Sequence, residues 1–175
     1  MRSPTEIPLL ATDGVVNAVI ESPAGATAKL KWEPALQLFV LSRPLPLGMS
    51  YPHDWGFLPG TCAADGDPLD VMVLSEATSY PGLVVPARPV GVLRLEQRDE
   101  DSGGRQRQRN DRVLAVPRKA ARLDVGDVSE LPVRVREELE RFFVDAVFFE
   151  PKDPSLLGWG GPKEAWALIQ ASATR

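Results

Sequence analysis

Short runs of β-branched and apolar residues, separated by proline and glycine, fill the first two thirds of the chain. Apolar and polar residues alternate within these runs, which is typical of strands because successive side chains point to opposite faces. The pattern predicts six strands, at residues 15–20, 28–33, 36–42, 69–74, 88–97 and 112–117. Six short strands with turns between them favour a closed or nearly closed β-barrel.

The hydrophobic period changes in the last third of the chain. Between residues 129 and 149, apolar side chains recur at i, i+4, i+7 and i+8, the stripe of an amphipathic helix. Ser129 is expected to cap this helix, with Pro132 in its first turn. A second helix is expected to begin at Pro162. The pattern therefore predicts an α+β, mainly β fold with helices packed outside a barrel, and residues 1–175 are expected to form a single domain.

Composition narrows the classes of function. The formal net charge is −4 and the pI is about 5.1, which disfavours a protein whose main work is to neutralise nucleic-acid phosphates. No apolar run approaches the roughly 20 residues that cross a bilayer, and the N-terminus lacks the features of a secretory signal. Cys62 is the single cysteine, so an intrachain disulfide cannot form. We therefore expect a cytoplasmic protein with no membrane or nucleic-acid partner.

One basic segment, SGGRQRQRND at residues 102–111, lies between two predicted strands. Arg105, Arg107 and Arg109 alternate along it and would suit phosphate or nucleic acid. Alternate charges in a polar hairpin are also typical of a solvated loop, which is the interpretation that we favour. A nucleic-acid-binding barrel that used this segment would show affinity that falls steeply with salt, and the acidic pI argues against it.

The segment ADGDPLDVMV at residues 64–73 places Asp65, Asp67 and Asp70 directly before a predicted strand. Like charges this close disfavour ionisation unless cations or solvent screen them. An exposed acidic turn is one interpretation, since Asp, Gly and Pro are common turn residues. A helix-loop-helix calcium loop does not fit, because Leu69 and Asp70 would stand where it needs an oxygen ligand and a glycine. The third interpretation is that the carboxylates converge and bind hard cations such as Mg²⁺.

This aspartate pattern resembles the signature of the Mg²⁺-dependent soluble inorganic pyrophosphatases. Other segments resemble that family in the same order along the chain, namely VIESP, KWE, RPLPLGMSYPHDWGFLPGT, RPVGVL, RVLAVP and ELERFF. The similarity extends from about Val15 to Ala171. It implies a five-stranded OB-type closed β-barrel with two or three flanking α-helices, and hydrolysis of inorganic diphosphate to two phosphates. It also implies homo-oligomers, which among bacterial relatives are often hexamers.

The resemblance also implies roles for individual residues. Two divalent ions about 3.5 to 4 Å apart can clamp the substrate and lower the pKa of a shared water. Asp67 would take a proton from that water and is the expected catalytic residue. The expected metal ligands are carboxylates, namely Asp65, Asp70, Glu21, Glu33 and Asp111. The expected substrate ligands are cationic, namely Lys31, Arg43 and Arg112.

The sequence departs from the family pattern at positions that matter for such a site. Taken alone, Lys31 and Glu33 would suit a solvated strand face with a weak ion pair. Residues unlike the family's charged or hydroxyl ligands occupy five positions, namely Trp55, Gln97, Asn110, Ala146 and Val147. Asp111 stands beside Asn110, and a one-residue bulge would let it substitute. These departures keep open a second hypothesis, a homologue that binds Mg²⁺ and phosphate with little turnover.

Overall fold

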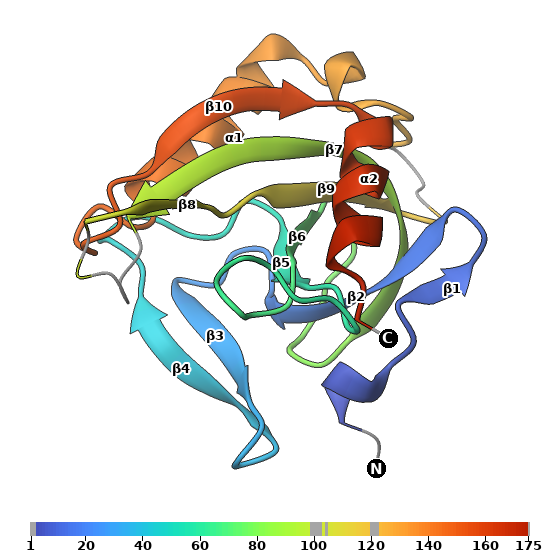
Figure 1. The fold of residues 1–175 in the computed structure, drawn as a ribbon, viewed down its shortest axis with the longest axis horizontal. Helices are drawn as coiled ribbons and strands as arrows, with labels where there is room; N and C mark the ends of the chain where they lie inside the picture. The colour runs from blue at the N-terminus through green and yellow to red at the C-terminus, as the bar shows by residue number, and fades with distance from the viewer. Residues whose placement is uncertain (1–2, 99–102, 104, 120–122, 175) are drawn as a thin grey trace.

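A computed structural model describes residues 3–98, 103, 105–119 and 123–174. Within these residues the chain forms ten strands and two α-helices, so the fold is α+β and mainly β, as the pattern predicts (Figure 1). The strands are β1 Leu10–Thr12, β2 Val15–Ser22, β3 Ala28–Glu33, β4 Leu38–Pro44, β5 Asp54–Phe57, β6 Asp70–Val73, β7 Val84–Arg98, β8 Arg107–Arg109, β9 Arg112–Pro117 and β10 Ser155–Gly160. The helices are α1 Val133–Asp145 and α2 Pro162–Ser172, with short 3-10 helices at Pro4–Glu6 and Val128–Glu130.

Five strands pair in a ring. Neighbours in the order β2, β5, β6, β9 and β7 are hydrogen-bonded, and β7 pairs with β2 in turn. Strand β7 can complete the ring because it is 15 residues long and uses successive sections for β2, β9, β10 and β8. The pairing of β6 with β9 is parallel. The ring of pairings is observed, whereas an OB-type closed barrel stays a prediction.

The ring does not use all the strands that the pattern assigns to a barrel. Residues 28–33 and 36–42 are predicted barrel strands, but β3 and β4 form a separate two-stranded sheet that projects as a hairpin (Figure 1). Strand β5 takes a place in the ring instead, and its four residues, DWGF, are too few for the pattern to predict. Gly56 fits there because β2 comes very close, so that a Cβ would lie 1.8 Å from the Val19 carbonyl oxygen.

Helix α1 begins later than the pattern predicts. Ser129 lies in the 3-10 helix Val128–Glu130 and does not cap α1, which begins after Pro132. Proline holds the residue before it in extended backbone, and Leu131 has φ −65° and ψ 140°. The second helix begins at Pro162, as predicted. The described helices include none with the length and apolar character needed to span a membrane.

Strand β6 is buried on both faces, which explains why its sequence is an unbroken apolar run. Val71 and Val73 belong to one cluster of buried side chains, to which α2 contributes Ile169. Met72 belongs to a second cluster, which α1 covers with Phe142 and neighbouring side chains. The two clusters hold β6 firmly, so they fix the position of the acidic residues at its start.

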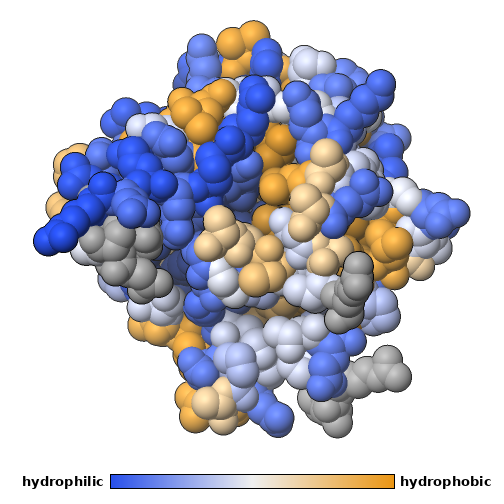
Figure 2. Space-filling model, in the orientation of Figure 1, coloured by the Kyte–Doolittle hydropathy of each residue, from blue (hydrophilic) through white to orange (hydrophobic). Residues whose placement is uncertain are grey.

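The basic segment at residues 102–111 lies at one end of the sheet, and residues 102 and 104 are outside the described residues. Its strand β8 pairs with the end of β7. Arg107 forms ion pairs with Glu96 at 2.8 Å and Asp153 at 3.1 Å. Figure 2 shows hydrophilic side chains gathered on this side of the molecule. A solvated, internally paired surface therefore accounts for Arg107 and for Arg109, which pairs with Asp111 at 2.7 Å.

Candidate active site

The acidic segment folds as a tight turn that leads into β6. Gly66 has φ of 82°, a region that glycine adopts without strain, and its N–H donates to the Ala63 carbonyl oxygen at 3.0 Å. The Asp67 N–H donates to the Asp65 carboxylate at 3.2 Å. Asp65 thus turns back onto its own loop, while Asp67 and Asp70 line a pocket of about 220 Å³.

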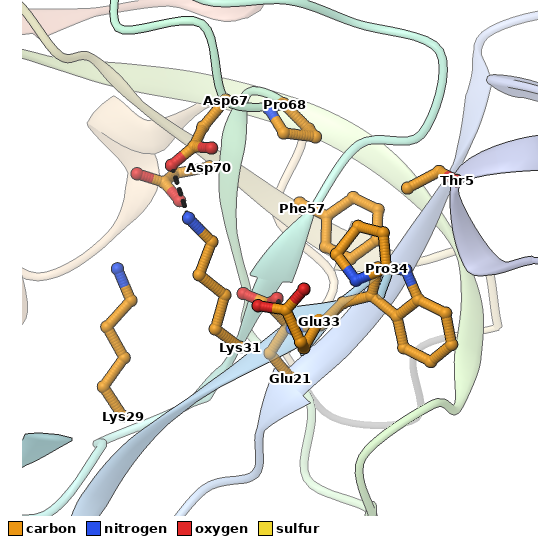
Figure 3. Close-up of a pocket in the computed structure, with 11 residues that line it drawn as sticks. Thr5, Glu21, Lys29, Lys31, Glu33, Pro34, Phe57, Asp67, Pro68 and Asp70 are labelled. Carbon is orange, nitrogen blue, oxygen red and sulfur yellow. Dashed lines mark hydrogen bonds and ion pairs between the residues drawn. The ribbon is translucent and has the colours of Figure 1, made fainter. Parts of the chain in front are cut away.

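This first pocket lies between the acidic turn and strand β3 (Figure 3). Its charged lining residues are Glu21, Lys29, Lys31, Glu33, Asp67 and Asp70. The Lys31 ammonium forms an ion pair with the Asp67 carboxylate, with 2.8 Å between Nζ and Oδ2. The structure therefore brings together five of the residues that the sequence predicts for the site, from β2, β3, the turn and β6.

A second pocket adjoins the first at Lys29, which lines both; we call it the cationic compartment. Its charged lining residues are Lys29, Arg43, Arg112 and Lys152, and none of the described residues that line it is acidic. Tyr51 and Trp55 form part of its wall, and the Arg112 guanidinium carbon lies 5.3 Å from the centre of the Trp55 ring. Several cations against an aromatic wall suit the binding of an anion.

Arg112 connects the two pockets. The parallel pairing of β6 with β9 sets Val71 opposite Val113, so the residues that precede them, Asp70 and Arg112, are neighbours. The Arg112 Nη1 donates to the Asp70 carboxylate and to the Asn110 side-chain oxygen. The two charged side chains are only 12% and 21% exposed, so solvent screens their attraction less than it would at the surface.

Arg43 and Asp111 lie outside the first pocket, as Asp65 and Arg112 do, and both have protein partners. Arg43 lines the cationic compartment, and its Nη1 donates to the Ala146 carbonyl oxygen at 2.7 Å. Asp111 accepts hydrogen bonds from Arg109 at 2.7 Å and from the Leu95 N–H at 3.0 Å. Asp111 therefore points toward β8 and the end of β7, while Asn110 faces Arg112.

Burial shifts the protonation of Glu21. This side chain is 6% exposed, and desolvation raises its pKa to about 7, against the lowering effect of a hydrogen bond from the Trp32 N–H at 2.8 Å. The nearby Asp70 raises the pKa further, while Lys29 and Lys31 lower it. Burial also lowers the pKa of Lys29, and the hydrogen bond to Asp67 raises that of Lys31.

Glu21→Gln is expected to remove part of the pH dependence of folding stability. The folded state holds a proton on Glu21 up to a pKa of about 7, whereas the unfolded chain releases it near 4.5, so stability falls as pH rises between these values. The full difference is about 3 kcal/mol at pH 8. Urea unfolding from pH 5 to 8 should show a flatter stability curve for the variant. An equal slope in both proteins would contradict the assignment.

Comparison with known proteins identifies the family. A model of the inorganic pyrophosphatase family matches residues 18–175. The chain belongs to this family. The inorganic pyrophosphatase of Thermus thermophilus is 37% identical over 165 residues, covering 92% of this chain and 90% of that protein. That of Synechocystis is 36% identical over 167 residues, covering 95% and 94%.

Solved structures agree with this membership. A crystal structure of the Thermus thermophilus inorganic pyrophosphatase superposes with a TM-score of 0.87, at 34% sequence identity. The match covers 98% of this chain and 97% of that one. The pyrophosphatase family thus accounts for the fold over nearly the full length of the chain.

Pyrophosphatases are metal-dependent, but the carboxylates here do not fit a site for several resident ions. Among the residues that the structure describes, no three His, Cys, Asp or Glu side chains lie close enough together to hold one ion. Asp67 and Asp70 each bind a protein cation instead. Gln97 and Asn110, which fill the family's later acidic positions by resemblance, are buried and uncharged.

Sequence reasoning missed Lys29, the one described cation that lines both pockets. Side chains two apart on a strand share a face, so Lys29, Lys31 and Glu33 are all placed on the same side of β3. That alternation was sufficient to suggest Lys29 as a candidate. Its depth could not be inferred, because it depends on how the hairpin packs against β2 and the acidic turn.

Proposed function

We propose that this chain hydrolyses inorganic diphosphate to two phosphate ions, with Mg²⁺ as the counter-ion of the substrate. The observation that carries the proposal is the position of Asp67, whose carboxylate lines the first pocket together with Asp70. This pocket shares Lys29 with the cationic compartment. A proton acceptor beside a group of cations is what water attack on a phosphoanhydride requires. Membership of the pyrophosphatase family supports the same substrate.

The reaction assigns each group a separate task. The oxygen of a water attacks one phosphorus, its proton passes to Asp67, and the bond from that phosphorus to the bridging oxygen breaks. The bridging oxygen leaves with the second phosphate. Lys31 holds Asp67 toward the pocket, and Lys29 and Arg112 neutralise the charge that accumulates on the leaving phosphate.

The direct test is phosphate release from diphosphate by the purified chain in the presence of Mg²⁺. Release should rise in proportion to protein concentration and saturate with diphosphate. Adenosine triphosphate should be a poor substrate, because the first pocket holds only about 220 Å³. Absence of release from diphosphate at every Mg²⁺ concentration would overturn the proposal.

Lys29→Gln is expected to lower kcat/KM for diphosphate by about ten- to a hundredfold, since it removes a charged contact from both pockets. Lys163→Gln is the matched control, because Lys163 lies in helix α2 and lines neither pocket. Steady-state kinetics of the two variants measure the difference. Equal kcat/KM values would show that Lys29 does not contact the substrate.

We extend the proposal to the domain organisation, the localisation and the assembly of the protein. We take residues 1–175 as a single domain whose five-strand ring is an OB-type closed barrel, in a cytoplasmic homo-oligomer that binds no nucleic acid. Large apolar side chains on the surface support self-association, among them Leu36, Leu38, Leu47 and Phe149. Light scattering after gel filtration tests the assembly, with a hexamer as the state to compare first.

A further inference from the structure

Two of the four acidic residues that line the first pocket, Asp67 and Asp70, are each paired with a cation of the protein. Lys31 pairs with Asp67 at 2.8 Å, and Arg112 pairs with Asp70. The Lys31 and Asp67 side chains are 47% and 57% exposed, so this pair faces the opening of the site. The Arg112 pair is deeper, with side chains 12% and 21% exposed. Positive charge is therefore already present where a metal-binding site would leave carboxylates unpaired.

The buried polar residues around Arg112 are amides. Gln97 and Asn110 are 6% and 7% exposed, and the Asn110 oxygen accepts from Arg112. An amide offers a carbonyl oxygen but no charge, and hard cations bind most strongly where several charged oxygens converge. These two positions thus make a cation of the protein easier to accommodate beside Asp70 than a divalent ion.

The cationic compartment has the charge that a phosphate anion requires. Four basic side chains line it, and none of the described lining residues is acidic. Arg112 uses one nitrogen, Nη1, for both Asp70 and Asn110. A guanidinium carries five N–H donors, so the same group can hold Asp70 and still donate to an anion.

We propose that Lys31 and Arg112 take the place of resident divalent ions, so that this chain binds diphosphate directly when no divalent ion is present. The inference rests on diphosphate as the substrate. It concerns binding alone. Mg²⁺ would then enter and leave the site bound to the diphosphate.

Isothermal calorimetry in excess EDTA tests the inference. Diphosphate titrated into the wild-type chain should give saturable binding, and Mg²⁺ titrated alone into EDTA-free protein should give no saturable heat. Lys31→Gln should weaken the diphosphate binding about tenfold or more, because it leaves the Asp67 charge unpaired beside the anion. Arg134→Gln is the matched control, since it removes a cation that pairs with Glu138 on the exposed face of α1.

A gain of metal binding provides the complementary test. Gln97→Glu with Asn110→Asp changes each side chain by little in volume. It adds one carboxylate next to Arg112, at position 110, and one in the lining of the cationic compartment, at position 97. The double variant should gain saturable Mg²⁺ binding and lose diphosphate binding in EDTA by about tenfold or more. Circular dichroism checks its fold, and Lys31→Gln, at an exposed position, provides the test if the double variant does not fold.

The results separate this inference from the proposed function. No diphosphate binding to the wild type in EDTA, or tight Mg²⁺ binding without diphosphate, would overturn the inference even if phosphate is released in Mg²⁺. Saturable binding in EDTA that Lys31→Gln weakens would support it even if no phosphate is released, a result that would refute only the proposed function.

Discussion

Asp67→Asn is expected to reduce kcat for diphosphate hydrolysis by about a hundred- to ten-thousandfold, the usual contribution of a positioned general base. Asparagine keeps the size of the side chain but cannot accept a proton from water at neutral pH. Asp67 is exposed on the turn before β6 and pairs with Lys31, so the substitution should leave the fold intact. Phosphate release under saturating diphosphate measures the loss.

The matched control for this variant is Asp145→Asn. Asp145 also pairs with a basic residue, Arg141 at 2.7 Å, but it lies at the end of α1 and lines neither pocket. Its kcat should equal that of the wild type. If Asp67→Asn retained wild-type kcat while both variants stayed folded, Asp67 would not be the proton acceptor.

Gly56→Ala is expected to destabilise the fold by more than about 4 kcal/mol, enough to leave little folded protein. A Cβ at this position would lie 1.8 Å from the Val19 carbonyl oxygen and 2.9 Å from the Ile20 Cα. Both atoms are backbone in β2, so no side chain can move to make room. The variant would have to separate β2 from β5 and open the ring.

Gly126→Ala is the control for the loss of a glycine. A Cβ there would meet the Glu130 carboxylate at 3.4 Å, the flexible end of a side chain. Its free energy of unfolding should stay within about 0.5 kcal/mol of the wild type. Urea denaturation compares the variants, and similar midpoints for Gly56→Ala and Gly126→Ala would contradict the close packing of β2 against β5.

Local sequence patterns predicted where single strands lie better than which strands pair with one another. Residues 112–117 and 28–33 are strands with the predicted bounds. Such strands can be predicted because the pattern of apolar and polar residues is a local property of the sequence. The hairpin of β3 and β4 nevertheless lies outside the ring. The ring is closed by β7, whose pairing with β2 joins residues almost 70 positions apart, and such pairing leaves no mark in a local pattern.

In the candidate site, too, the residues could be predicted from local motifs, whereas their pairing could not. The order of the motifs grouped Glu21, Lys31 and Asp67 as site residues, and in the structure all three line one pocket. The pairing of Arg112 with Asp70 could not be predicted, because it follows from the register between β6 and β9. Asp111 points away for a related reason, since it meets Arg109 and the β7 backbone.

The most direct test of the account is a diphosphate titration of the ¹⁵N-labelled chain, followed by NMR in Mg²⁺. Shift changes should concentrate at residues 29–31, 65–70 and 112, ranges that contain lining residues of the two pockets. Changes confined to the basic segment at residues 105–109, or none at saturating diphosphate, would contradict it.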